Sequence, residues 1–213
     1  KDQSYVLYPL TAGLRWDYDL RQKQADGSIK VRQMGMGVAA SSQTASGVTE
    51  ARLERGYEGW SPPATRAVSD AQGVRLSRAA EAPGGPSLQI IKLPADAGAR
   101  WPGRPLTGGN AESIVVRGEE DIEVPAGKFR AIHVDHEITY ANGDGDVLSY
   151  WYAPGSGCVR MIERTTISIG GVTQKLAVEG VMTKLTPDAW PKPASLARPS
   201  VAEGLGLLPQ RIR

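Results

Sequence analysis

The densest group of side chains that could do chemistry is the run His133-Val134-Asp135-His136. Imidazole and carboxylate groups bind zinc, and together they also act as acid–base pairs in hydrolysis. Apolar and polar residues alternate around this run, which predicts a strand, so His133 and His136 point to opposite faces and cannot share one ion. His133 and Asp135 share a face, but two ligands do not make a metal site. We predict no metal centre, a solvent-facing His133–Asp135 pair, and His136 as a core or cross-strand residue.

A second candidate for metal chemistry is the alternation of Asn142, Asp144 and Asp146, which is typical of the start of a calcium loop. Such a loop needs a bidentate Glu at its twelfth position, and that position is Ala153 here. The intervening glycines suit a tight turn instead, because glycine adopts positive φ angles without strain. The segment is therefore predicted to be a hairpin turn.

Candidates for catalysis are few. Glu119, Glu120 and Asp121 could supply paired carboxylates for glycoside chemistry, although such a run more often ends a solvated strand. No G-x-S-x-G elbow is present, and Cys158, the single cysteine, is predicted to be a small buried side chain. No G-x-G-x-x-G fingerprint is present, so no nucleotide cofactor is expected. We predict a non-enzymatic protein without a cofactor; the alternative is a hydrolase of envelope glycans or lipids that uses Glu119–Asp121 or the His133/Asp135 pair.

The elements that must position these side chains are predicted to be strands. Hydrophobic residues recur with period two over Leu14–Arg21, and an Asp26-Gly27 turn leads to a return strand over about Ile29–Ala40. Further strands are expected in the first half at Val48–Tyr57, near Val74–Arg78 and near Leu88–Leu93. Residues 94–111 are predicted to be a long loop that carries Trp101, because they hold three prolines and four glycines.

The second half has clearer hairpin signals. A strand ends at Val124, before the turn Pro125-Ala126-Gly127, and a four-strand antiparallel meander is predicted after it. Its strands are expected at 128–140, 147–153, 159–169 and 172–185. The pattern predicts about nine or ten antiparallel strands, with few helical residues, in an all-β domain over residues 1–185 that is curved into a half-barrel or an open sandwich.

Composition and charge agree with an all-β domain and exclude some partners. The 213 residues include 25 Gly and 15 Pro, which suits many short strands joined by turns. A net charge of +2, dispersed along the chain, does not indicate nucleic-acid binding, and no apolar run is long enough for a membrane span. The chain opens at Lys1-Asp2-Gln3 without Met, which we interpret as a mature start behind an export signal or a lipid-bearing cysteine, although an artificially trimmed start would look the same.

Two surfaces are candidates for binding. Tyr150 and Tyr152 should line the face opposite Trp151, and with Trp101 they could form a concavity for a lipid or another apolar ligand. Residues 186–213 contain five prolines and no strand pattern, which predicts an extended tail. Its apolar side chains should dock on a surface of this domain or, as we favour, of a protein partner or a second copy. Trp190 is expected to be the anchor, with a second contact from Leu205, Leu207, Leu208 and Ile212.

Three segments carry a resemblance to a group of uncharacterised bacterial envelope proteins. Tyr8-Pro9-Leu10-x-x-Gly13-x-x-Trp16-x-Tyr18, Val124-Pro125-Ala126-Gly127-x-Phe129 and Trp151-Tyr152-Ala153-Pro154-Gly155 are similar to its opening and to two of its turns. The group includes the TapB-like family, and its fold is similar to the half-barrel of the lipoprotein carriers LolA and LolB. The likeness covers about residues 5–185; this chain departs from it at Ser156-Gly157-Cys158 and in the tail.

The resemblance implies a fold and a compartment, and it brings no catalytic residues. It implies a periplasmic or extracellular protein, tethered to the outer membrane or cell surface if the start is lipid-modified. Together with the lack of a catalytic set, it leads us to expect an exported binding or accessory module that holds an apolar ligand or a partner segment on its concave face. The alternative is a structural subunit of an extracytoplasmic or membrane-associated assembly, docked through the tail.

Overall fold

The computed structural model describes residues 7–24, 26–80, 86–142, 144–169 and 172–186, with side chains for all of these except 165–169 and 172–176. The described residues form one antiparallel sheet of twelve strands. The strands are β1 (Arg15–Lys23), β2 (Ile29–Gln43), β3 (Thr49–Tyr57), β4 (Thr65–Asp70), β5 (Gly73–Arg78), β6 (Leu88–Lys92), β7 (Arg100–Pro102), β8 (Ala111–Val124), β9 (Gly127–Thr139), β10 (Gly145–Ala153), β11 (Gly157–Ile169) and β12 (Val172–Thr186).

The sheet is an open meander whose order is β6-β5-β4-β3-β2-β1-β12-β11-β10-β9-β8-β7. Each strand pairs with its neighbours in sequence, apart from β6 and β7, which are the two edges and do not pair with each other. The pairing of β1 with β12 joins the two halves of the sheet. This confirms the predicted all-β class and the predicted meander of the second half. None of the described residues belongs to a helix long and apolar enough to cross a membrane.

The two faces of the sheet follow from the period-two pattern of the strands. In β1 the buried side chains are Trp16, Tyr18 and Leu20, and the residues between them are partly exposed. We call the face that carries Trp16 and Tyr18 the inner face and the opposite one the outer face. The N-terminal segment packs on the inner face, since the ring centroid of Tyr8 lies 6.0 Å from those of both Trp16 and Tyr152.

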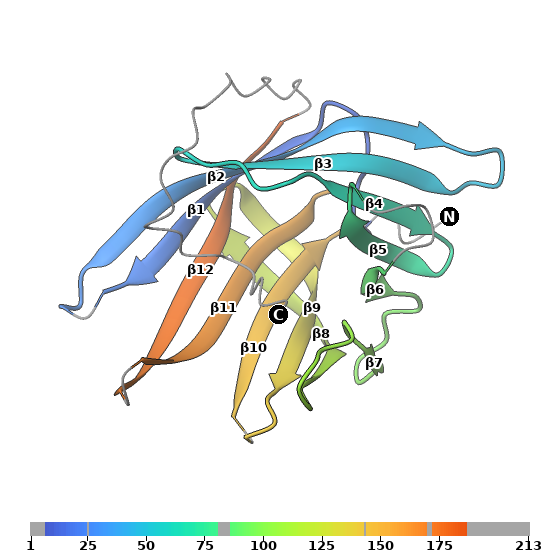
Figure 1. Ribbon diagram of the computed structural model, residues 1–213. Helices are drawn as coiled ribbons and strands as arrows, with labels where there is room; N and C mark the ends of the chain where they lie inside the picture. Colours follow the sequence, from blue (N-terminus) through green and yellow to red (C-terminus); the bar gives the residue numbers. More distant parts are fainter. Residues whose placement is uncertain (1–6, 25, 81–85, 143, 170–171, 187–213) are drawn as a thin grey trace.

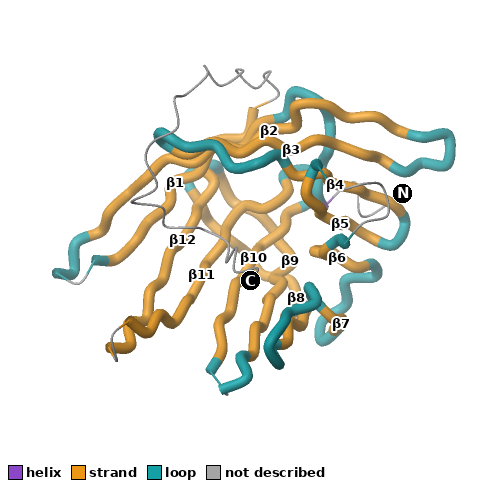
Figure 2. The backbone as a smooth tube through the Cα atoms, in the orientation of Figure 1, coloured by secondary structure: helices purple, strands orange, loops and turns teal. Residues whose placement is uncertain are grey.

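Curvature brings distant strands of the sheet together. Figures 1 and 2 show β2–β5 arching across one end while β8–β12 fan away from it. The two edges approach each other, because the indole N–H of Trp101 on β7 donates a 2.7 Å hydrogen bond to the carbonyl of Gln89 on β6. The turn between β8 and β9 also contacts a distant strand, because the backbone N–H of Ala126 donates to the carbonyl of Met182 on β12 at 3.0 Å. The inner face is therefore the concave one.

Two strands were missed by the sequence pattern, so the sheet has twelve strands rather than the nine or ten expected. β4 has a charged or polar residue at most positions, yet it pairs with β3 on one side and β5 on the other. β7 is a three-residue strand inside the segment predicted to be a loop, and it pairs with β8. Both form because a neighbouring strand offers free backbone hydrogen bonds, which local sequence does not reveal.

The predicted tail lies almost wholly outside the described residues, which end at Thr186. The expected partner-binding residues Trp190, Leu205, Leu207, Leu208 and Ile212 are all in this undescribed part. Their docking role stays a prediction, as does the boundary of the domain at residue 185.

Candidate functional site

The inner face of strands β7–β11 carries the side chains that the sequence suggested for ligand binding. Strand register aligns Trp101, Ile114, His136, Leu148 and Glu163 in one row, because each is the cross-strand partner of the next. Residues that are directly opposite in antiparallel strands point to the same face. An apolar row on the concave face is thus interrupted by an imidazole and a carboxyl group.

Tyr150 and Tyr152 lie on this face, as predicted, with ring centroids 6.2 Å apart. Their environments differ, because Tyr152 is 4% exposed and packs on Tyr8, whereas Tyr150 is only partly buried. Trp101 is 6% exposed and is held by its bond to Gln89. Tyr152 and Trp101 are therefore part of the core that shapes the concave face, and Tyr150 is the member of the predicted set with surface to offer.

Sulfur-containing and aromatic side chains surround Tyr150. Met161 is its cross-strand partner on β11, and the Tyr150 ring contacts those of Tyr152 and His136. Tyr8 packs on Tyr152, and the Tyr8 hydroxyl lies 3.9 Å from the sulfur of Met36. Desolvation by burial raises the pKa of Tyr150, of Tyr152 and of Tyr18 well above the usual value of a phenol, so these groups are neutral at physiological pH. Burial likewise raises the pKa of Cys158 to about 12, which agrees with its predicted role as a buried small side chain. The surface is apolar and adaptable.

Glu163 is the exception on this surface. It is partly buried, and it makes no hydrogen bond or ion pair with any other residue whose side chain is described. Burial raises the pKa of Glu163 to about 7, and the positive charge of Arg55 opposes this rise only in part. Arg55 stands on β3, four strands away from β11 in the sheet order, so its influence on Glu163 acts across the concavity.

His136 belongs to a second polar group, buried beside the row. Its Nδ1 lies 3.1 Å from Oε1 of Glu112, and the backbone N–H of Arg104 donates to the other Glu112 oxygen at 2.8 Å. Burial opposes ionisation of Glu112, but its hydrogen bonds with His136 and Arg104, together with the charge of Arg104, outweigh this effect and lower the pKa of Glu112 to about 2. The Nε2 atom of His136 is buried and has no hydrogen-bond partner among the described residues.

The sequence pattern missed Glu163, Arg55 and Glu112 as candidates. The sequence did contain a signal for Arg55 and Glu163, because each is a charged residue at a position where the alternation of its strand predicts an apolar one. Arg55 sits between Leu53 and Tyr57 at inner positions of β3, and Glu163 follows Met161 at an inner position of β11. A charged residue at a position expected to be apolar marks either a misplaced face or a polar site in the interior.

The outer face holds the predicted His133–Asp135 pair. The Nδ1 of His133 lies 2.8 Å from Glu120, and its Nε2 lies 2.9 Å from Asp135. The imidazole stacks on Trp151 with centroids 4.3 Å apart, and the guanidinium of Arg160 lies 5.0 Å from the Trp151 ring. Trp151 is therefore buried beneath polar side chains of the outer face. His136 lies on the opposite face of β9, as the alternation predicted.

The carboxylates considered for hydrolysis are held by ion pairs and hydrogen bonds. Glu119 and Asp121 both contact Arg130, at 2.9 and 3.3 Å, and their side chains are 58% and 82% exposed. Hydrogen bonds from the indole of Trp151 and from His133 lower the pKa of Glu120, which favours its ionised form over a general acid. In the calcium-like turn, Asn142 and Asp144 bond each other, while Asp146 accepts a hydrogen bond from Tyr140. Among the described residues no His, Cys, Asp and Glu side chains form a group of three or more suited to a metal ion.

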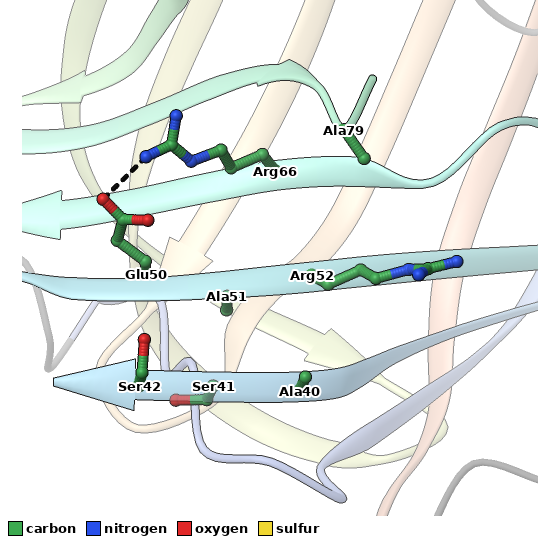
Figure 3. Close-up of a pocket in the computed structure, with 8 residues that line it drawn as sticks. All are labelled: Ala40, Ser41, Ser42, Glu50, Ala51, Arg52, Arg66 and Ala79. Atoms are coloured by element: carbon green, nitrogen blue, oxygen red, sulfur yellow. Dashed lines mark hydrogen bonds and ion pairs between the residues drawn. The ribbon is translucent and has the colours of Figure 1, made fainter. Parts of the chain in front are cut away.

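A shallow depression of about 340 Å³ lies between β2, β3 and β4. Figure 3 shows its centre, where Arg66 contacts Glu50 at 2.7 Å. Besides this pair and Arg52, its walls are small side chains: Ala40, Ser41, Ser42, Ala51 and Ala79. Because Glu50 already neutralises Arg66 and the walls offer few apolar contacts, this depression is a weaker candidate than the inner face.

Comparison with known proteins places the fold without assigning a family. No protein-family model and no curated protein matches the chain. The structure is similar to a putative lipoprotein from Parabacteroides distasonis, with a TM-score of 0.53, 17% identity, and coverage of 85% of this chain and 98% of that one. It is also similar to a putative exported protein with a YmcC-like fold from Bacteroides fragilis, with a TM-score of 0.50, 14% identity, and coverage of 85% and 99%. At these identities the likeness shows the fold alone, and the resemblance to TapB-like proteins and to LolA and LolB stays a prediction.

The raised pKa of Glu163 predicts that the stability of the fold depends on pH. Because its pKa is about 7 in the folded chain and its ordinary value is 4.5, folding favours the protonated form. This contribution is complete below pH 4.5 and is lost as the pH rises through about 7. We expect the native chain to lose about 1–3 kcal/mol of unfolding free energy over this range relative to Glu163→Gln. Urea unfolding of both proteins between pH 4.5 and 7.5 measures this difference, and parallel pH profiles would contradict it.

Proposed function

We propose that this protein is an exported, non-enzymatic binding module of a bacterial envelope that holds an apolar ligand on the inner face of its sheet. The observation that carries the proposal is the concave face around Tyr150, where partly exposed Tyr and Met side chains line a surface that also holds Glu163, which has no ion-pair partner among the described side chains. Aromatic and methionine side chains at a concave surface are typical of sites for apolar ligands. The putative lipoprotein and exported protein that share the fold support the extracytoplasmic placement.

The geometry of these carboxylates and of His133 supports a binding role over hydrolysis. A glycosidase needs two carboxyl groups that face each other across a substrate, one of them protonated. Here Glu119 and Asp121 are solvated and paired with the same arginine, and both ring nitrogens of His133 already face carboxylates. A hydrolase would have to break these contacts before it could act.

An uncharged dye tests the proposal. N-phenyl-1-naphthylamine fluoresces when it enters an apolar site, and we expect the purified protein to bind it. Met161→Gln should weaken this binding about 5- to 10-fold, because a polar amide replaces an apolar contact on the inner face. Ile162→Gln is the matched control, since Ile162 is the next residue of β11, is also partly buried, and faces outward.

Native mass spectrometry of gently purified protein complements the dye. A co-purifying lipid would identify the natural ligand directly. A bare protein that also leaves the dye in water would overturn the proposal, as would equal loss of dye binding in Met161→Gln and Ile162→Gln when both variants are folded.

A further inference from the structure

The inner face carries two ionisable side chains, Arg55 and Glu163, on strands that the curvature of the sheet brings to the same concavity. Arg55 on β3 and Glu163 on β11 both occupy inner positions, and the charge of Arg55 acts on Glu163 and on Tyr150. Within the described part of the chain, neither Arg55 nor Glu163 makes an ion pair. Arg55 is instead held by a hydrogen bond to Tyr57, its neighbour two residues along the strand.

An uncompensated carboxyl group at this position is costly. Withdrawing a polar group from water without giving it a partner opposes folding, because the hydrogen bonds lost to water are not replaced. Native proteins keep few such groups, and those they keep are often part of a functional site. The position of Glu163 therefore requires an explanation beyond packing.

A second, independent observation lies in the same row. The Nε2 atom of His136 is buried and has no partner among the described residues, although the residue is only 4% exposed. Leu148 separates His136 from Glu163 across the sheet, so the two backbones are about 10 Å apart. His136 Nε2 and the Glu163 carboxyl group thus both lack hydrogen-bond partners among the described residues, and both lie on the apolar concave face. This arrangement is expected for a surface that completes its hydrogen bonds with a ligand.

The charges around this surface favour an anion. Arg55 is always protonated, while Glu163 is largely neutral below pH 7. Among the other groups on this face, Tyr57 and Tyr150 are neutral because burial raises the pKa of each. Asp146, further along β10, is engaged by the hydroxyl of Tyr140. Beside His136, Glu112 and Arg104 form an ion pair.

We propose that the inner face selects amphiphiles with one anionic headgroup, a carboxylate or a phosphate, which Arg55 pairs and to which the protonated Glu163 donates a hydrogen bond. A guanidinium presents a planar set of donors that fits either headgroup in a bidentate manner. The apolar chain of the ligand then lies over Tyr150 and Met161. This inference rests on the proposed binding function and adds the sign of the headgroup to it.

Displacement of N-phenyl-1-naphthylamine by C12 compounds tests the selection. At pH 6 we expect dodecanoate or dodecyl phosphate to displace the dye at concentrations at least about 10-fold lower than dodecanol or dodecyltrimethylammonium. Preference for the carboxylate points to a free fatty acid, and preference for the phosphate points to a phospholipid headgroup; both support the proposal. If the alcohol or the cation competes equally well, the inference is wrong, while the proposed apolar binding function survives.

Variants assign the selection to named side chains. Arg55→Gln should remove the preference for the anion, whereas Arg52→Gln should retain it, because Arg52 lies on the same strand with its side chain 61% exposed on the outer face. Should Arg55→Gln fail to fold, Arg55→Lys keeps the charge without the planar fork and should weaken the preference about 2- to 5-fold. An unchanged preference in a folded Arg55 variant would overturn the proposal.

The role of Glu163 is read from the pH dependence. With dodecanesulfonate, which stays ionised throughout, the native protein should bind about 5- to 10-fold more weakly at pH 8 than at pH 6, because the ionised Glu163 repels the headgroup and competes for Arg55. Glu163→Gln should bind equally at both values. A native protein whose affinity does not fall over this range would remove Glu163 from the site.

Discussion

Replacing Trp16 with alanine is expected to lower the free energy of unfolding by about 3–5 kcal/mol. The side chain is 0% exposed, its ring packs on Tyr8, and its indole N–H donates a 2.6 Å hydrogen bond to the carbonyl of Ser156. The substitution leaves a cavity and an unpaired carbonyl where the N-terminal segment, β1 and the turn before β11 meet. Gly157 in that turn already lies so close that an added Cβ would stand 3.3 Å from the indole nitrogen.

Chemical denaturation of the variant measures this loss. Trp60→Ala is the matched control, because Trp60 is 46% exposed and mainly stacks on Tyr57, at 5.2 Å between centroids. The control should lose less than about 1 kcal/mol. Similar losses in the two variants would mean that Trp16 does not anchor the junction of these segments.

Replacing Glu112 with alanine is expected to cost a similar amount, about 3–5 kcal/mol. The Glu112 side chain is 0% exposed and holds both Arg104 and His136, so its removal leaves the buried His136 and the partly exposed Arg104 without this partner. Glu119→Ala is the control, since its 58% exposed carboxylate contributes one surface ion pair to Arg130. Exposed pairs contribute about 0–1 kcal/mol.

The same carboxylate predicts how the protein responds to acid. The pKa of Glu112 is about 2 in the folded chain against an ordinary value of 4.5, so folding favours the ionised form. This stabilisation is present above pH 4.5 and is lost as the pH falls towards 2. Glu112→Gln should therefore unfold with a flatter pH dependence over that range than the native protein. A native protein and a variant with equal slopes would show that the ion pair does not stabilise the fold.

Much of the fold could be predicted from the sequence. The alternation in Leu14–Arg21 places Trp16 and Tyr18 inside and Asp17 and Asp19 outside, and the structure agrees. The turns at Pro125-Ala126-Gly127 and Pro154-Gly155 also lie where proline and glycine indicated them. These signals are local, because a side-chain period and a positive φ angle depend on a few adjacent residues.

The two missed strands show where local signals end. β4 has too few apolar residues to be recognised by itself, and β7 is too short for any pattern. Each exists because an adjacent strand has backbone groups to satisfy, and those partners come from β3 and β5 in one case and from β8 in the other. The number of strands is therefore a property of the assembled sheet.

The sequence by itself determined which residues of each strand face the core, because the period of a strand is independent of its neighbours. It placed Tyr150 on one face and separated His133 from His136. Only the tertiary structure decided that Tyr152 and Trp101 are buried, that Tyr150 remains accessible, and that Arg55 acts on Glu163. Those relations depend on the curl of a sheet in which β3 and β11 are four strands apart, and curvature is set by the packing of the whole inner face.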